Sequence, residues 1–422
     1  MVLSNSQWLA SSGGGAAITS VEKSALFVVG NSARLARLSM SGTATTWTAS
    51  FWVYRGALGG TGAKFMFTTS SDGGLAFANN STADILTWYS GSYTATTSVF
   101  RDIGWYHMVV KSVAGAGTVY VNGEEVLSGL TVNGADAIMS IGSYNNGSNY
   151  FDGMMSEWVF IDGTALNPTS FAGYDTSGLY WTPKSSTVIK ALTFGTNGFY
   201  LDNTTNAQTD ASGEGNNFTN NNTVVTTTNT PTNIVATLNP LNLVVGTGAP
   251  VLNIGNTRIT SSAATGYNSG ALTTIPMGAG GKYYFEVYVE GLVANAVPYG
   301  ISLGISPFDL PRKFDSYTTV PGKSVYEGGT IDFEGSGYTF LQANAAAQAT
   351  NIAPYAPSVG QYLQCAFDSS NGKIWYGINN TWYGSGNPST GANPASTLDV
   401  VTTWHGWIAC YTTAAKAVTN FG

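Results

Sequence analysis

One stretch, residues 104–127 (GWYHMVVKSVAGAGTVYVNGEEVL), constrains the fold of this chain more than any other. Its valines, on both sides of a short Gly/Ala loop, predict two strands, and Asn122-Gly123 is the kind of pair that two-residue hairpin turns favour. Residues 361–382 (QYLQCAFDSSNGKIWYGINNTW) repeat the pattern, with Asn371-Gly372 at the turn. Two such hairpins, far apart in one chain, predict two β-sandwiches.

The composition argues against a chain built from long helices. Gly, Thr and Asn are abundant, and these residues form helices poorly but suit strands and turns. Charged residues make up only 9% of the 422 residues, against about 25% in typical domains, while 43% hydrophobic residues allow large cores. We therefore predict an all-β fold, with two antiparallel β-sandwich (jelly-roll) domains joined by an extended linker rich in Thr and Asn.

The charge pattern excludes several classes of partner. The formal net charge is −7, and no cluster of Lys or Arg is visible. A protein that neutralises phosphates needs such a cluster, so neither nucleic acid nor an anionic membrane is expected as a partner. No apolar run approaches the ~18 residues of a membrane span, and the first residues, MVLSNSQWLASSGGG, lack the character of a secretory signal. We therefore expect no membrane insertion.

The chain begins with a segment of no clear periodicity, residues 1–23. Trp8 and Leu9 precede the glycines at 13–15, and an apolar anchor before a flexible joint fits an arm that docks on a partner. A frayed terminus is the alternative interpretation.

Residues 24–172 are predicted to form the first sandwich. Short strands separated by turn signals recur at intervals typical of all-β domains. The expected strands are 25–29, 37–40, 48–54, 64–67, 75–77, 137–141 and 154–161, together with the hairpin of 104–127.

This segment resembles the laminin-G-like, concanavalin A-like jelly rolls. The residues that carry the resemblance are the strand 47–53 (WTASFWV), the start Trp105-Tyr106-His107, the turn 120–123 (YVNG), and the closing stretch from Asp152-Gly153 to Asp162-Gly163. Domains of this group often bind calcium through loop carboxylates. No dense acidic loop is visible here, so calcium is not predicted.

Residues 173–235 are predicted to be an extended linker. The segment holds a Thr/Asn tract at 223–232, and only residues 199–201 could form one more strand. Pieces of residues 161–219 (IDGTALNPTSF, GTNGFYLDN and GEGNNFT) look like a module common in bacteriophage virion proteins, and the opening MVLSNSQWLAS looks like the same group. This resemblance implies that Trp8 and Leu9 anchor the chain to other virion proteins.

Residues 236–422 are predicted to form the second sandwich. The strand 282–289 (KYYFEVYV) alternates most clearly, with Tyr283, Phe285, Val287 and Val289 on one face. The half resembles the SPRY (B30.2) sandwich, a binding scaffold without catalytic residues. The resemblance rests on 281–287 (GKYYFEV), 300–304 (GISLG), the hairpin from 366–368 to 371–375, and the terminal 420–422 (NFG); the long segment 309–340 departs from the pattern.

Cysteine and histidine offer little chemistry. Cys365 and Cys410 alternate in phase with apolar neighbours, which predicts buried thiols, although a bridge between them stays open because both lie in one half. His107 and His405 lie in predicted strands, and neither accompanies the nucleophile elbow of a Ser-His-Asp triad. No clustered spacing of His and Cys suggests zinc. We predict no catalytic residue, no metal and no cofactor.

A glycan-cleaving enzyme would need two carboxylates about 5–10 Å apart. The acids that lie close in sequence are Asp152, Glu157, Asp162, Asp332 and Glu334. Asp332 and Glu334 share one face if their segment is a strand, but paired acids on a strand are more often a solvated face.

Aromatic residues in predicted loops are the better lead, because sugars stack their C–H faces on aromatic rings beside amide and hydroxyl groups. Core or subunit-interface packing is the alternative interpretation for each of them. The candidate ligand-binding residues are Trp88, Tyr89, Tyr93, Tyr144, Asn145, Asn146, Tyr150, Tyr317, Tyr326, Trp382 and Tyr383, with Asn149 beside them.

Taken together, the residues and the resemblances predict a non-enzymatic structural protein on the surface of a bacteriophage particle. The expected role is that of a tail fibre or adhesin that binds a host-surface glycan or receptor. The alternatives are a capsid fibre or decoration protein without a receptor role and, in another class, a glycan depolymerase. The weakly charged surface suits packing against copies of the chain, and the resemblance implies a trimer.

Overall fold

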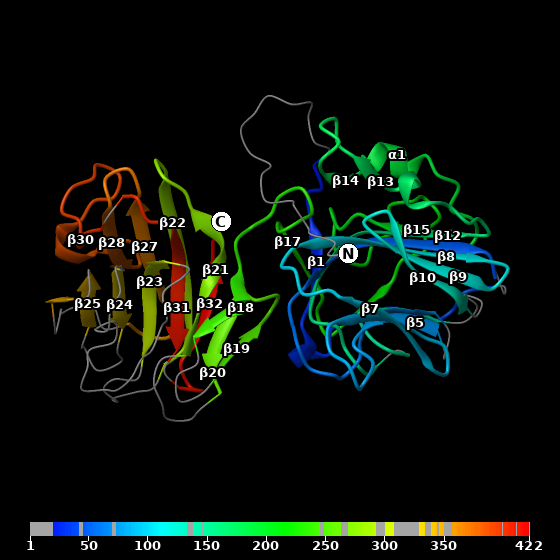
Figure 1. Cartoon of the computed structure of the whole chain (residues 1–422), viewed down its shortest axis with the longest axis horizontal. Helices are drawn as coiled ribbons and strands as arrows, with labels where there is room; N and C mark the ends of the chain where they lie inside the picture. Colours follow the sequence, from blue (N-terminus) through cyan, green and yellow to red (C-terminus); the bar gives the residue numbers. More distant parts are fainter. Residues whose placement is uncertain are drawn as a thin grey trace. The chain divides into compact units, whose positions relative to one another are not determined.

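The computed structural model describes residues 20–41, 45–69, 73–132, 138–145, 147–244, 249–262, 269–292, 300–307, 329–333, 339–343, 346–349, 357–398, 400–410 and 412–421. The chain divides into two compact units, Met1–Val235 and Ala236–Gly422. Figure 1 shows that strands make up most of both units. Among the described residues, no helix combines the length and apolar character that a membrane crossing requires.

The first unit is built almost entirely of short strands, with only brief helical turns between them. Its strands are β1 Ser24–Phe27, β2 Arg34–Arg37, β3 Trp47–Arg55, β4 Lys64–Thr69, β5 Gly73–Phe77, β6 Ile85–Tyr89, β7 Tyr93–Val99, β8 Trp105–Val113, β9 Ala116–Val121, β10 Glu124–Thr131, β11 Met139–Ile141, β12 Gly153–Asp162, β13 Ala172–Tyr174, β14 Trp181–Pro183, β15 Phe199–Leu201, β16 Thr219–Asn221 and β17 Val225–Thr227. Its helical turns are η1 Val29–Asn31, η2 Pro168–Ser170 and α1 Ser186–Lys190.

Two antiparallel sheets form the sandwich of the first unit. Across the described residues, the sheet that we call the β3 sheet has the order β10-β9-β8-β3-β12-β1-β17, with β15 also paired to β12. The opposing sheet, the β4 sheet, has the order β16-β2-β11-β4-β5-β6-β7. Figure 1 shows the two sheets as stacked layers. The prediction of an all-β antiparallel fold is confirmed.

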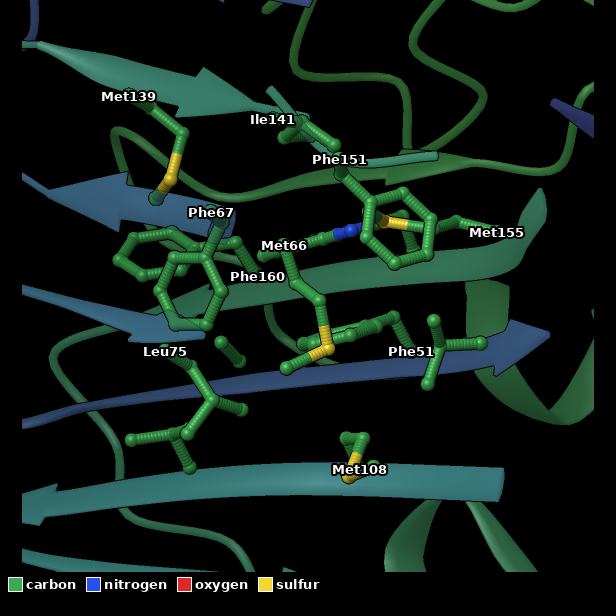
Figure 2. Close-up of a cluster of buried hydrophobic side chains, with 14 of the residues drawn as sticks. Phe51, Met66, Phe67, Leu75, Met108, Met139, Ile141, Phe151, Met155 and Phe160 are labelled. Carbon is green, nitrogen blue, oxygen red and sulfur yellow. The ribbon is translucent and has the colours of Figure 1, made fainter. Parts of the chain in front are cut away.

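The inward faces of these sheets make a core rich in aromatic and methionine side chains. Phe51 stacks on Trp158 with ring centroids 4.7 Å apart, and Phe67 meets the same indole edge-on at 5.2 Å. Figure 2 shows Met66, Met108 and other side chains of both sheets converging on this space. Such burial contributes roughly 25 cal/mol per Å² of apolar surface and is the main stabilising term of the unit.

The hairpin predicted from residues 104–127 is confirmed. β8 and β9 pair from Met108–Val121 to Val113–Ala116, and the Asn-Gly turn leads into β10. Asn122 and Gly123 have φ values of 49° and 87°, the left-handed conformation that a tight hairpin turn requires. The Asn122 side chain also accepts a hydrogen bond from the backbone N–H of His107 at 2.8 Å.

The prediction of an extended linker over 173–235 is wrong. Residues 219–221 form β16 on β2, and residues 225–227 form β17 on β1, so the predicted linker supplies an edge strand to each sheet. Residues 199–201, expected as one more strand, form β15 on β12. These strands are three residues long and pair with partners far away in sequence, and local composition cannot report such pairing.

Residues 163–211 cover the outer face of the β3 sheet, and we call them the cover segment. Figure 1 shows β13, β14 and α1 on the side of this sheet that faces away from β5 and β7. Phe171, Ile189 and Phe194 of the cover segment pack on Val109 and Val159 of the sheet. The outer face of this sheet is therefore a second core rather than a free surface.

The second unit is another sandwich of two antiparallel sheets. Its strands are β18 Leu238–Val244, β19 Pro250–Asn253, β20 Arg258–Ser261, β21 Ser269–Met277, β22 Lys282–Gly291, β23 Ile301–Pro307, β24 Gly329–Phe333, β25 Thr339–Ala343, β26 Ala346–Ala349, β27 Tyr362–Asp368, β28 Lys373–Ile378, β29 Thr381–Trp382, β30 Ser396–Thr397, β31 Trp404–Cys410 and β32 Lys416–Asn420, with one helical turn, η3 Tyr383–Ser385.

The two sheets of this unit enclose a core of their own. Among the described residues, the β22 sheet has the order β19-β20-β32-β22-β27-β28-β29, with β30 also on β28, and the β31 sheet has the order β18-β21-β31-β23-β24-β25-β26. Cys365 lies in β27 and Cys410 in β31; both thiols are free and buried, and burial raises the pKa of each. The expectation of two buried thiols in strands is confirmed.

Candidate functional site

Two aromatic groups that are distant in sequence meet on the outer face of the β4 sheet. Tyr89 lies 4.9 Å from Tyr93 and 5.6 Å from Tyr144, measured between ring centroids. Phe65 lies beneath them, 6.2 Å from Tyr89 and 4.8 Å from Tyr144. We call Tyr89, Tyr93 and Tyr144 the tyrosine cluster. Its rings are only partly buried, so they form an aromatic surface on the outside of the sandwich.

Strand alternation explains why these rings point outward. Tyr89 and Tyr93 are directly opposite each other across the β6–β7 hairpin, whose turn holds Gly91 at a φ of 73°. Trp88, the preceding residue, points to the other side and is buried in the core, where its Nε1 donates to the carbonyl of Thr131 at 3.0 Å. The prediction that Trp88 is a loop residue available to a ligand is therefore wrong.

A β-bulge in β4 places Phe65 under the cluster. The register with β5 shifts between Phe65 and Phe67, so that Met66 and Phe67 both enter the core while Phe65 faces outward. Bulges redirect side chains in this way. The backbone N–H of Phe65 also donates to the carbonyl of Asn149 at 3.1 Å, which holds the 144–150 loop against the strand.

Amide groups stand beside the rings. Asn80 donates from Nδ2 to the hydroxyl of Tyr93 at 3.1 Å, and its Oδ1 accepts from the backbone N–H of Ala63. Asn145 is exposed next to Tyr144, and Tyr150 donates its hydroxyl to the carbonyl of Gly147 at 2.9 Å. The structure thus brings Tyr89 and Tyr93 of one predicted group together with Tyr144 of the other. The sequence analysis missed the roles of Phe65 and Asn80, although the Asn79-Asn80-Ser81 turn signal precedes the strand of Tyr89.

The tyrosine cluster is electrically neutral. Partial burial raises the pKa of Tyr93 above its ordinary value, which keeps its hydroxyl protonated near neutral pH. Rings, hydroxyls and amides of this kind suit a ligand that offers both apolar C–H faces and hydroxyl groups.

The remaining predicted residues lie elsewhere. Trp382 belongs to β29, where its ring lies against Gly377, and Tyr383 in η3 packs against the core of the second unit. Asn146, Tyr317, Tyr326, Trp8 and Leu9 lie outside the described residues. The binding role of each of these residues stays a prediction.

His107 is hydrogen-bonded to a serine, but the direction of the hydrogen bond is the reverse of the one that catalysis needs. Trp181 donates its indole N–H to His107 Nδ1 at 3.1 Å, and because an indole can only donate, Nδ1 must accept. The neutral ring then carries its proton on Nε2 and donates it to Ser50 Oγ at 2.9 Å. A triad needs the reverse direction and a carboxylate on Nδ1. Burial lowers the pKa of His107 to about 3, and His405 is likewise buried, with Nδ1 on the carbonyl of Thr273.

Asp152, which directly precedes β12, and Asp162 at the end of β12 serve separate structural contacts. Asp152 accepts from the backbone N–H of Val29 at 3.3 Å, and Asp162 accepts from Asn197 Nδ2 at 2.9 Å. Each of these two acids is thus engaged by a partner of its own, and no described contact joins either of them to Glu157. Asp332 lies in β24, and Glu334 is outside the described residues.

Glu157 is the most unusual of these acids. It has a φ of 51° where the pairing of β12 with β3 shifts register, and its carboxylate accepts a hydrogen bond from the Tyr200 hydroxyl. Burial raises its pKa to about 7, and nearby Asp202 adds to the rise. Lys190 of the cover segment pairs with Asp202 at 3.3 Å. The group lies under the cover segment, where it fastens that segment to the sheet.

Metal binding has no support from these side chains. Within the described part of the chain, no three or more His, Cys, Asp or Glu side chains gather closely enough to hold a metal ion.

One comparison with known protein families matches part of the first unit. Residues 29–170 match the profile of the concanavalin A-like lectin/glucanase superfamily. No curated protein in the comparison matches the chain.

Solved structures of related fold include a candidate carbohydrate-binding protein from Bacteroides ovatus, 18% identical, with a TM-score of 0.37, covering 50% of this chain and 60% of that one. The SPRY domain of human HERC1 is 14% identical, with a TM-score of 0.31, covering 43% of this chain and 96% of that one. Domain 4 of an extracellular arabinanase from Geobacillus stearothermophilus, solved with arabinotriose, is 22% identical, with a TM-score of 0.25, covering 31% of this chain and 65% of that one. Similarities of this size carry no inference about ligand or activity.

Proposed function

We propose that this chain is a non-enzymatic glycan-binding protein and that the tyrosine cluster of its first unit binds a saccharide. The observation that carries the proposal is the meeting of Tyr89, Tyr93 and Tyr144 on one open sheet face, 4.9 Å and 5.6 Å apart. The match of residues 29–170 to a superfamily of lectins and glucanases supports the same ligand class.

The geometry suits a sugar in a specific way. A pyranose ring presents an apolar C–H face, which stacks on a tyrosine ring, and hydroxyls at its edge, which bond to amides. Tyr93 and Tyr144 flank Tyr89, while Asn80 and Asn145 supply donors and acceptors beside them. Phe65 supports the rings from below, so little side-chain entropy is lost on binding.

A binding role without turnover fits the acids and histidines. His107 donates to Ser50 rather than accepting its proton, and Glu157 is hydrogen-bonded to Tyr200 beneath the cover segment. Asp202 is the acid that acts on Glu157, but Asp202 is paired with Lys190 and both acids are buried, so this pair fits a structural contact better than the depolymerase alternative.

The biological setting that we propose is the surface of a bacteriophage particle, as a tail fibre or adhesin. It rests on the resemblance of residues 161–219 and of the opening segment to phage virion proteins. In this setting Trp8 and Leu9 dock on other virion proteins, the chain assembles as a homo-oligomer with a trimer favoured, and the glycan belongs to the host surface. Deletion of residues 1–15 should abolish incorporation into particles. Normal incorporation of the truncated chain would contradict the proposal that this segment docks on other virion proteins.

The binding proposal is tested by applying the full chain to a broad glycan array and then titrating a bound oligosaccharide by calorimetry. Tyr144→Ala and Tyr93→Ala should each weaken binding at least about tenfold. Tyr174→Ala is the matched control, because Tyr174 is 61% exposed on the cover segment, away from the cluster. Equal binding by all variants, or no glycan bound by the wild type, contradicts the proposal. Release of reducing ends would instead support the depolymerase.

A further inference from the structure

The β22 sheet of the second unit also carries aromatic and polar side chains on its outer face. Along β22, Phe285 and Val287 point into the core, while Tyr284, Glu286 and Tyr288 point the other way. None of these outward residues belongs to the set predicted to bind ligand. The sequence could have predicted their position, because the residues between the alternating apolar residues of a strand lie on its opposite face.

Strand register sets the central side chains of this face in one row. Glu286 is directly opposite Asn420 on one side and Gln364 on the other. Gln364 is in turn opposite Gly377, and the ring of Trp382 lies against that glycine, 3.1 Å from where a Cβ would stand. The row therefore crosses five neighbouring strands, from β32 to β29.

A continuous hydrogen-bond network fixes this row. The Tyr284 hydroxyl donates to Glu286 Oε2 at 2.7 Å and accepts from Gln364 Nε2 at 2.6 Å. The same amide reaches Asn380 Oδ1 at 2.9 Å, and Asn420 Nδ2 donates to Glu286 Oε1 at 3.0 Å. Gln364 is only 3% exposed, so a buried polar group anchors the network. The network orients its members before any ligand arrives, which lowers the entropic cost of binding.

Aromatic rings border the network and reach solvent. Tyr284 is 49% exposed and meets Trp382 edge-on, with ring centroids 6.5 Å apart. Tyr362 is 43% exposed and lies 5.3 Å from Tyr288, which is opposite it in the sheet. Large rings held open on both sides of a polar row give stacking surfaces and hydrogen-bonding groups within one face.

The charge of the row selects among ligands. Of the ion pairs found among the described residues, none involves Glu286, so no described Lys or Arg side chain neutralises its carboxylate. Each of its oxygens accepts one hydrogen bond and keeps a further lone-pair site for a ligand. Burial and the bond to Glu286 raise the pKa of Tyr284 to about 12, so its hydroxyl stays a donor at neutral pH. Hydroxyl donors complement this centre, whereas carboxylates are repelled.

We propose that the face formed by Tyr284, Glu286, Gln364, Tyr362 and Trp382 is a second saccharide-binding site, which accepts neutral sugars and excludes acidic ones. It does not depend on the tyrosine cluster of the first unit, because its residues belong to another compact unit. If both sites operate, the chain binds a glycan surface bivalently, and each weak site gains from the other through effective concentration.

The test titrates the full chain with cellohexaose, mannohexaose and galactohexaose as neutral probes and with oligogalacturonate as the acidic probe. At least one neutral hexasaccharide should bind, and Tyr284→Ala and Tyr362→Ala should each weaken that binding at least about tenfold. Glu286→Gln replaces an acceptor oxygen with a donor, so it should weaken the neutral binding, and it should strengthen oligogalacturonate binding at least about tenfold. A merely structural role for Glu286 would not change selectivity by charge.

The first-unit double variant Tyr93→Ala/Tyr144→Ala separates this inference from the proposed function. Residual binding in that variant that is lost on adding Tyr284→Ala supports the second site, even if the first site fails. Binding lost entirely in the double variant leaves the first site standing and overturns the second. Absence of binding to all three neutral probes also overturns the inference. So does a Tyr362→Ala variant that changes the oligomeric state but not the sugar affinity, because the face would then be a protein interface.

Discussion

The two sheets of the first unit carry aromatic residues on their outer faces, but among the described residues a cover segment packs on only one of these faces. On the β3 sheet, Trp52 and Trp105 lie beneath the cover segment, where they meet Ala172 and Trp181. On the β4 sheet, the tyrosine cluster packs on Phe65 and two buried alanines, Ala63 and Ala76, and its rings are only partly buried. The first arrangement stabilises the fold, and the second leaves rings available to a ligand.

This difference teaches that aromatic residues in a strand say little about binding until their face and its cover are known. Trp181 in the cover segment donates to His107, and the hydroxyl of Tyr200 binds Glu157, so polar groups on the covered face are consumed by structure. On the open face, Asn80 and Asn145 stand beside rings that solvent reaches.

The largest expected effect is on the covered face. Trp105→Ala removes a fully buried indole that packs on Tyr54 and donates to Asn229 Oδ1 at 3.3 Å. We expect a loss of about 3–5 kcal/mol in the free energy of unfolding of the first unit. Guanidinium unfolding followed by tryptophan fluorescence measures it, with Tyr93→Ala as the control from the open face. A loss below about 1 kcal/mol would show that the face is not packed as described.

The second prediction concerns the pH dependence of stability. The pKa of Glu157 is raised from 4.5 to about 7 by burial, so the folded state binds its proton more tightly than the unfolded state does. The contribution of Glu157 to the free energy of unfolding is therefore largest below about pH 4. This contribution is lost as the pH rises through 7, by up to about 3 kcal/mol. Urea unfolding at pH 5 and pH 8 should show that Glu157→Gln gains stability relative to the wild type at the higher pH.

For His107 the dependence of stability on pH has the opposite sign and falls at lower pH than for Glu157. The pKa of His107 is lowered by burial, so stability is present above about 6.5 and is lost as the pH falls toward 3. The comparison of wild type with Glu157→Gln isolates the glutamate because His107 is common to both. Parallel pH profiles for the two proteins would mean that Glu157 is not buried against Tyr200.

A small effect on stability is expected from the open face. Tyr93 is partly exposed and contacts the ring of Tyr89 and the exposed amide of Asn80, so Tyr93→Ala should cost under about 1 kcal/mol in the free energy of unfolding. Its effect on glycan affinity should be larger than its effect on unfolding. A cost comparable with that of Trp105→Ala would place Tyr93 in the core and remove the contrast between the faces.

We expect no change in the protonation state of His107 across the neutral pH range. Nitrogen-15 NMR should show a neutral ring with its proton on Nε2 from pH 8 to pH 5, because Trp181 occupies Nδ1 and burial disfavours the charged form. A midpoint near 6.5 would indicate a solvent-accessible ring.

The sequence analysis predicted the hairpins well because their turns are local. Asn122-Gly123 and Asn371-Gly372 lie where the chain reverses between paired strands, and the flanking residues alternate. The prediction that Trp88, Tyr89 and Tyr93 lie in a loop was wrong, because they belong to the strands β6 and β7. The sequence did hold a cue for this hairpin: Ser-Gly-Ser at 90–92 lies between two runs of residues that favour strands.

Other features could not be read from the chain. The bulge at Met66, which turns Phe65 outward, depends on packing between sheets. The role of residues 163–211 as a cover, and the pairing of 219–221 and 225–227 with β2 and β1, depend on contacts between distant parts of the sequence. The meeting of Tyr89 with Tyr144 is of the same kind, so the site emerged only when the strands were placed side by side.

The most direct test of the account is to titrate the isotope-labelled full chain with the oligosaccharide that binds best on a glycan array, and to follow the aromatic ring resonances. The account predicts that the rings of Tyr89, Tyr93 and Tyr144 shift in proportion to occupancy, while those of Trp52, Trp105 and Trp181 do not move. Shifts confined to the indoles under the cover segment, or an undisturbed tyrosine cluster at saturation, would contradict it.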